Sequence, residues 1–153
     1  MAETILNCFS KAEIDCCVYI AEATGHTFGR TAFIGPQLPY PSCMSFEFTG
    51  SNPNDTSFLS SHSMPTFPMS ARVYVSALTR EAVWDFIARV VNALPRRDLT
   101  ENVELLRISS VGLITAEEQQ FQGEPRPRVV WTCQIDLQAV VITGGKTEET
   151  AEE

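Results

Sequence analysis

The chain has 153 residues, and its eleven Lys and Arg against nineteen Asp and Glu give a formal net charge of −8. This length suits one domain, and an apolar fraction of 44% predicts that most of the chain folds. The excess of acidic residues argues against a protein that reads nucleic acid or docks on anionic lipid, and no apolar run is long enough to predict a membrane span.

The first predicted element is a short helix. Ser10 and Glu13 form an S-x-x-E capping box, in which each side chain satisfies a free backbone N–H, so the helix is expected to begin near residue 10. Gly25 suits the left-handed residue that ends a helix. Helical spacing predicts one buried face, made of Ile14, Cys17, Val18 and Ala21. Residues 1–9 either extend this helix or form a separate arm.

A proline-rich connector follows and leads into a strand. Pro36, Pro39 and Pro41 lack a backbone N–H, so residues 35–41 are expected to be extended and not part of a central strand. Residues 43–49 alternate between polar and apolar types, which predicts a strand with one apolar face made of Met44, Phe46 and Phe48.

Residues 50–68 are predicted to form a long loop, because Gly, Ser, Asn, Asp and Pro dominate them. Long loops are uncommon in compact domains and are often functional. This one carries four large apolar residues, Phe58, Leu59, Met64 and Phe67. These side chains either form a surface for a partner or pack back onto the domain, and both interpretations stay open.

A second strand and the clearest helix come next. Residues 69–77 place Ala71, Val73 and Val75 on one face. Thr79 is the expected N-cap of a helix, and Glu81 lies in its first turn, where the helix dipole favours an anion. The helix carries a broad apolar stripe and ends at Pro95, with the stripe made of Val83, Phe86, Ile87, Val90, Val91 and Leu94.

Two further strands close the predicted domain. Residues 103–115 are β-rich, and Ser109, Ser110 and Gly112 suggest a bulge. Residues 116–128 are expected to form a polar hairpin connection. Residues 129–138 alternate strictly, which predicts a strand whose buried face consists of Val129, Trp131, Cys133, Ile135 and Leu137.

The order of these elements predicts an α+β fold with one mainly antiparallel sheet and two principal helices packed on one face. Residues 1–143 are expected to form this single domain. Residues 144–153 are polar and acidic, and they are expected to form a disordered tail.

Little in the sequence indicates catalysis or cofactor binding. The five cysteines form no CxxC pair, and neither His26 nor His62 has a metal-ligand partner at helical spacing, so we expect reduced thiols, no metal and no cofactor. No glycine-rich phosphate loop or nucleophile elbow is present. The N-terminus lacks the pattern of a secretory signal, which predicts synthesis in the cytosol. The chain is therefore expected not to be an enzyme.

With these elements placed, the chain resembles the tail-terminator and neck (tail-completion) proteins of tailed bacteriophages. The resemblance covers about residues 10–142. It rests on the short first helix, the proline-rich lead at residues 33–41, the strand at residues 70–76 followed by the helix at residues 79–87, and the final β-hairpin with its polar tip. The long loop and the acidic tail have no counterpart in that pattern.

The resemblance implies a virion structural protein of the tail or neck, assembled in the host cytoplasm. Such proteins form a homohexameric ring that caps the tail tube and joins it to the head connector. The implied partners are other copies of the chain, the tail tube protein and the connector protein. An acidic lumen would let DNA pass without adhering, and no membrane is involved.

Candidate interface residues lie in the long loop and at the hairpin tip. They are Phe58, Leu59, Met64, Phe67, Glu117, Glu118, Phe121 and Arg126. Arg72, Tyr74 and Trp84 are weaker candidates. The alternative roles are a head-completion or connector-adaptor protein and, in a different class, a small ligand-binding or hydrolytic enzyme with a pocket under the loop at 50–68.

Overall fold

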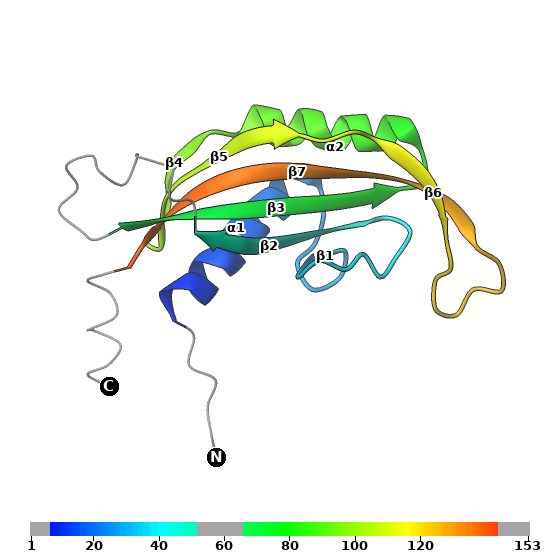
Figure 1. Cartoon of the computed structure of the whole chain (residues 1–153), viewed down its shortest axis with the longest axis horizontal. Coiled ribbons are helices and arrows are strands. Elements are labelled where there is room, and N and C mark those ends of the chain that lie inside the picture. Colours follow the sequence, from blue (N-terminus) through cyan, green and yellow to red (C-terminus); the bar gives the residue numbers. More distant parts are fainter. Residues whose placement is uncertain (1–6, 52–65, 144–153) are drawn as a thin grey trace, which may run out of the picture.

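The computed structural model describes residues 7–51 and 66–143 (Figure 1). It confirms the predicted α+β class, because two helices accompany a mainly antiparallel sheet. None of the described helices is long and apolar enough to cross a membrane. The helices are α1 (Cys8–Thr24) and α2 (Arg80–Ala93), and the strands are β1 (Ala32–Ile34), β2 (Cys43–Ser51), β3 (Thr66–Ala77), β4 (Arg96–Thr100), β5 (Val103–Val111), β6 (Thr115–Gln119) and β7 (Arg128–Ile142).

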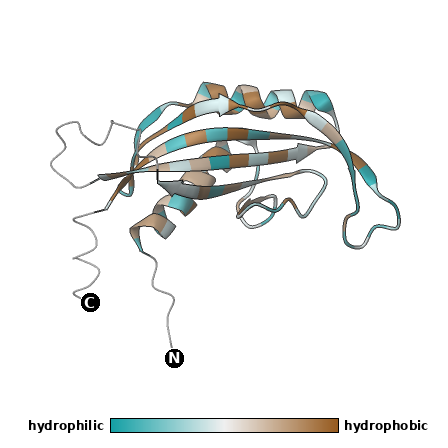
Figure 2. Ribbon diagram, viewed as in Figure 1, coloured by the Kyte–Doolittle hydropathy of each residue, from teal (hydrophilic) through white to brown (hydrophobic). Residues whose placement is uncertain are grey.

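The seven strands form one curled sheet in the order β1-β2-β3-β7-β5-β4, and β6 pairs with β7 beyond the end of β5. Among the strand pairs of the described residues, only β1 and β2 run parallel. Both helices pack on the same face of the sheet (Figure 1), because side chains of α1, α2, β3 and β7 share one buried cluster. Within residues 7–51 and 66–143, the opposite face carries no helix. Figure 2 shows the alternating hydropathy along β3 and β7 that separates the two faces.

Helix α1 begins earlier than the capping box predicts. Asn7 is the N-cap, and its Oδ1 accepts a hydrogen bond from the Ser10 backbone N at 2.8 Å. Ser10 therefore lies in the first turn and is not the cap. The C-terminal prediction is confirmed, since Gly25 adopts a φ of 83°.

The buried face of α1 is also rotated from the predicted one. Ile14 and Val18 are only half-buried, and the side chains that reach the core are Ala12, Cys16, Cys17, Ile20 and Ala21. Small residues dominate this face, so the helix backbone can approach the sheet closely. The larger β-branched residues at its margin are left partly exposed.

Glu13, the other half of the predicted capping box, has a tertiary partner instead. Its Oε2 accepts a hydrogen bond from the Phe48 backbone N of β2 at 2.7 Å. Burial raises the pKa of this carboxyl, the hydrogen bond from Phe48 opposes that shift, and nearby Glu47 adds to it. Glu13 thus ties α1 to β2 and titrates above its usual range.

We expect Glu13→Gln to change how stability depends on pH. The raised pKa means that the folded protein holds the Glu13 proton more tightly than the unfolded chain. The free energy of unfolding should therefore fall as pH rises through the window between the ordinary glutamate pKa and the higher folded one. Urea denaturation across pH 4–7 should show this fall in the wild type and a smaller one in Glu13→Gln. Parallel pH curves for the two proteins would contradict the assignment.

Strands β2 and β3 are longer and more buried than predicted. Ser45 and Cys43, on the face expected to be polar, are fully buried along with Met44 and Phe46, so the first half of β2 is covered on both sides. Strand β3 begins at Thr66, so residues 66–68 belong to the sheet and not to the predicted loop. The predicted buried face of β3 is confirmed, since Ala71, Val73 and Val75 are at most 2% exposed.

Helix α2 matches its prediction at the N-terminus and along most of the stripe. The Thr79 Oγ1 accepts from the Ala82 backbone N at 3.1 Å, as an N-cap does. Val91 is the exception, because it lies at the margin of the stripe and is 47% exposed. Arg96 and Arg97, which follow the expected helix end at Pro95, begin strand β4, which the sequence did not predict.

Strand β7 pairs first with β5 and then with β6. Relative to β7, this stretch contains one extra residue at each of three places. The register shifts between Val103 and Leu105, between Ile108 and Ser110, and again between Gly112 and Thr115. The second shift confirms the predicted bulge. Each bulge increases the local twist, so the three bulges along β5 and its passage into β6 add to the curl of the sheet (Figure 1).

Two predictions for the hairpin region were wrong. Thr115–Gln119, predicted as part of a polar connection, forms strand β6. On β7, Val129 is 53% exposed and Trp131 is only partly buried, although both were predicted to lie in the core. The alternation is real, but the first residues of β7 extend past the helices that would cover them.

Candidate assembly surface

The hairpin formed by β6 and the start of β7 projects beyond the rest of the sheet (Figure 1). Strand β3 pairs with β7 only as far as Ala77 opposite Trp131, whereas β6 pairs with β7 as far as Gln119 opposite Arg128. The distal part of this hairpin is therefore two strands wide. Both of its strands have a backbone edge that no described residue covers.

The structure places the predicted hairpin residues in different environments. Glu117 and Glu118 lie on β6 and are exposed, and Arg126 is exposed in the loop that follows. Phe121 is 6% exposed, so its ring packs inward and does not face a partner in this conformation. An ion pair between Arg128 Nε and Glu124 Oε1, 2.9 Å apart, joins the loop to β7.

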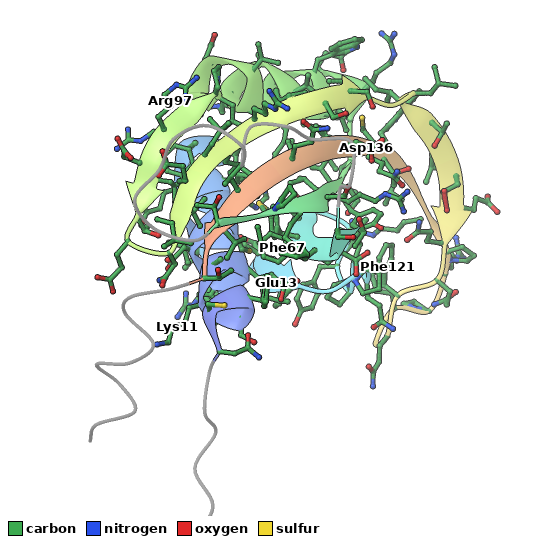
Figure 3. All side chains as sticks on the ribbon, turned by 60° about the vertical axis from the view of Figure 1, so that its left-hand side comes forward. Lys11, Glu13, Phe67, Arg97, Phe121 and Asp136 are labelled. Carbon is green, nitrogen blue, oxygen red and sulfur yellow. The ribbon has the colours of Figure 1, made fainter. Side chains whose placement is uncertain are left out.

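The other predicted residues lie elsewhere or outside the described ranges. Phe67 is near the start of β3, opposite Val141, and thus at the far end of β7 from the hairpin. It is 40% exposed, and its ring meets that of Phe9 edge-on at 5.7 Å (Figure 3). Phe58, Leu59 and Met64 fall within residues 52–65, outside the part of the chain that the structure describes. The fold therefore does not gather Phe67 and the hairpin residues into one patch.

The face of the sheet without helices carries a row of polar contacts. Arg72 Nε lies 3.2 Å from Asp136 Oδ1, and Ser110 Oγ donates to Asp136 Oδ2 at 3.1 Å (Figure 3). The Tyr74 hydroxyl donates to Glu47 Oε2 at 2.8 Å, and burial together with this carboxylate raises the pKa of Tyr74. The Arg72 and Asp136 side chains are 45% and 42% exposed, so their ion pair contributes little stability in water.

Burial shifts the pKa of three thiols and of His26. Burial raises the pKa of Cys16, of Cys17 to about 12, and of Cys43. A nucleophilic thiol needs the opposite shift, toward the thiolate. Burial also lowers the pKa of His26, whose ring meets that of Phe86 at 5.8 Å. Among residues 7–51 and 66–143, no group of three His, Cys, Asp or Glu side chains is placed to hold a metal ion.

Three exposed apolar residues lie where β5 passes into β6 and where β7 begins. Leu113 is 86% exposed, Val129 is 53% and Val111 is 41%. Sequence reasoning placed Val129 in the core and overlooked the other two. Leu113 follows the bulge at Gly112, and a bulge changes which face each later side chain takes, so strand alternation alone did not indicate its exposure.

Helix α2 presents a second, smaller apolar feature. Trp84 is 49% exposed, and the Arg80 guanidinium lies 5.8 Å from the centre of its ring. Leu78, just before the helix, is 48% exposed. This surface is separate from the hairpin in sequence and belongs to a different layer of the fold.

No protein-family model matches this chain, and no curated protein matches it either. A chain in a solved structure titled "Virion of native gene transfer agent (GTA) particle" is similar to it at 13% sequence identity. The match covers 86% of this chain and 96% of the other, with a TM-score of 0.46.

Proposed function

We propose that this chain is a virion structural protein of the tail or neck. In this role it acts as a tail terminator, forming a homohexameric ring that caps the tail tube and joins it to the head connector. The observation that carries the proposal is the projecting hairpin with open backbone edges and Leu113 86% exposed beside it. The order of elements that resembles tail terminators supports the same role.

Open strand edges and exposed apolar side chains are costly on a free monomer. An unpaired edge invites pairing with another chain, and natural proteins cover or charge such edges. Leu113, Val111 and Val129 add apolar area next to the edge of β6. In a ring, neighbouring copies can cover the open strand edges and the exposed apolar side chains of each subunit. This is possible because each contact in a ring joins two different surfaces.

The helix-free face suits a structural role rather than a binding pocket. Its side chains pair with one another across neighbouring strands, as Arg72 does with Asp136 and Tyr74 with Glu47. These pairs leave a polar surface over the centre of the sheet. With a net charge of −8, the ring would present little basic surface to DNA passing through its lumen.

The test is the assembly state of the purified chain, measured by native mass spectrometry alone and with tail tubes of the virus whose genome carries it. We expect a hexamer, either in solution at micromolar concentration or as a ring bound to tube ends in electron micrographs. Binding to the head connector instead of tube ends would favour the connector-adaptor role. A chain that stays monomeric with both tail tubes and head connector would overturn the proposal. That result would favour a ligand-binding or hydrolytic protein.

A further inference from the structure

Helix α2 carries an exposed stripe in addition to the one that it buries. Arg80, Trp84, Ala88 and Val91 follow one another at helical spacing, so they lie along one side of the helix, and all four are exposed. Trp84 is 49% exposed and Val91 is 47% exposed. Single apolar residues on a surface are common, but an aligned set that includes an indole marks a surface for a partner.

A positive charge accompanies this indole. The Arg80 guanidinium lies 5.8 Å from the centre of the Trp84 ring. Within the described residues, Arg80 has no ion-pair partner, and no acceptor receives the indole N–H of Trp84. Trp and Arg are the side chains most enriched at the energetic centres of protein interfaces. The pair therefore offers a partner one large ring, one N–H donor and one charge.

A groove lies on the helix-free face at the base of the hairpin. Its floor includes Tyr74 and Gln134, which are opposite each other on β3 and β7. Leu38 of the proline-rich connector lines one side, and Leu113 and Glu117 line the other. The groove encloses about 290 Å³. Sites for small molecules usually span about 300–1,000 Å³, so this volume suits a single large side chain.

Hydrogen bonds hold both sides of the groove in place. The Tyr40 backbone oxygen accepts from Cys43 Sγ at 3.3 Å and from Ser76 Oγ at 3.2 Å, which fixes the connector over the helix-free face. On the other side, the Thr115 and Thr132 hydroxyl oxygens lie 3.2 Å apart and join β6 to the floor. The groove therefore exists in the free subunit, so binding there requires little ordering.

The groove is chemically complementary to the surface of α2. Glu117 is its one carboxylate, and no Lys, Arg or His belongs to the described residues that line it. Glu117 accepts a hydrogen bond from a neutral amide, Gln119 Nε2 at 2.9 Å, and has no ion-pair partner among the described residues. Leu38 and Leu113 supply apolar flanks for a ring. The Gln134 side-chain oxygen is an acceptor that an indole N–H can use.

The two surfaces lie at the same end of the sheet but on opposite faces. Strand β3 ends at Ala77, opposite Trp131, and α2 begins soon afterwards at Arg80, close to the hairpin (Figure 1). Tyr74 and Gln134, in the floor of the groove, lie a few residues back along the same two strands and on the helix-free face. Each copy can therefore present α2 to one neighbour and the groove to another.

We propose that Trp84 of one copy inserts into the groove of the next copy, where Arg80 pairs with Glu117. The insertion covers Leu113, which is 86% exposed in the free subunit. The indole and the leucines hold the contact, and the ion pair fixes its direction. The proposal rests on the proposed function to the extent that the chain must self-assemble.

This contact joins copies head to tail. It uses two different surfaces, so every copy that binds leaves a free groove at one end of the assembly and a free Trp84 at the other. Such a contact repeats from copy to copy and closes into a ring when the rotation between neighbours allows. A two-fold contact between two α2 helices would instead leave both grooves empty and both copies of Leu113 exposed.

The first test removes the inserted ring. Trp84→Ala should weaken self-association on the order of 30–100-fold, measured by native mass spectrometry over a concentration series and by the occupancy of tube ends. Its melting temperature should stay close to that of the wild type, because Trp84 is half exposed and lies outside the buried core. Phe28→Ala is the matched control, since Phe28 is 41% exposed and belongs to neither surface. It should assemble like the wild type.

The second test reverses the charges of the proposed ion pair. Arg80→Glu and Glu117→Arg each place like charges across the contact, so each should weaken association. The double variant with both changes restores opposite charges in reversed order and should recover assembly. Glu118→Arg is the matched control, because it makes the same charge change on the opposite face of β6. It should assemble like the wild type.

The outcomes separate this contact from the proposed function. If the wild type forms rings and Trp84→Ala forms them equally well, the insertion is wrong while the proposed function stands. Trp84→Ala rings that form normally but fail to bind tube ends would also overturn it, because Trp84 would then contact the tube. A double charge variant that assembles no better than the single ones would overturn the pairing of Arg80 with Glu117. If the wild type forms no ring, alone or on tubes, both the function and the insertion are wrong.

Discussion

Replacing Phe46 with alanine should lower the free energy of unfolding by about 3–5 kcal/mol. Phe46 lies in β2 and is fully buried among β3 and the helices, and its ring meets that of Phe48 at 5.7 Å. Alanine would leave a cavity that neighbours on a central strand cannot close, because both flanking strands hold their positions through backbone bonds. Equilibrium urea denaturation measures the loss directly.

Phe67→Ala is the matched control, since it removes the same ring from a strand position that is 40% exposed. Its contact with Phe9 is a single edge-on pair, so a loss of about 1 kcal/mol or less is expected. Equal losses at the two positions would mean that the core is not centred on β2 and β3. A loss below 1 kcal/mol for Phe46→Ala would contradict its complete burial.

The second large effect is expected at Gly112, where β5 passes into β6. A Cβ added there would lie 2.8 Å from the Gln134 backbone oxygen, closer than side chains approach a carbonyl. The Gly112 backbone N also donates to that same oxygen at 2.8 Å. Gly112→Ala should therefore push the two strands apart, lower stability by about 1–3 kcal/mol and weaken self-association through the displaced β6.

Ser109→Ala serves as the comparison, because Ser109 is exposed at the preceding bulge and the change adds no atom near the partner strand. It should change stability by no more than about 0.5 kcal/mol. Thermal unfolding of both variants measures the loss of stability, and native mass spectrometry measures the loss of self-association. Normal stability and assembly of Gly112→Ala would show that the strands at this bulge have room to move.

The residues of the proposed assembly surface could be found from sequence only in part. Glu117, Glu118 and Arg126 were identified because a polar hairpin tip stands out between two apolar strands, and all three are exposed. The burial of Phe121 was not foreseen, since a single aromatic ring in a polar segment gives no sign of whether it folds back. Arg96 and Arg97 begin a strand that was not predicted, because nothing local marks the first residues of a short edge strand.

The sequence by itself determined the fold class, the cap and stripe of α2, and the buried faces of β3 and the middle of β7. These depend on residue periodicity and on hydrogen bonds between residues a few positions apart, which a linear pattern records. The tertiary structure alone decided the buried face of α1, the partner of Glu13, the short strands β1, β4 and β6, and the exposure of Leu113. Each of these depends on which distant strand lies alongside and on register shifts at bulges.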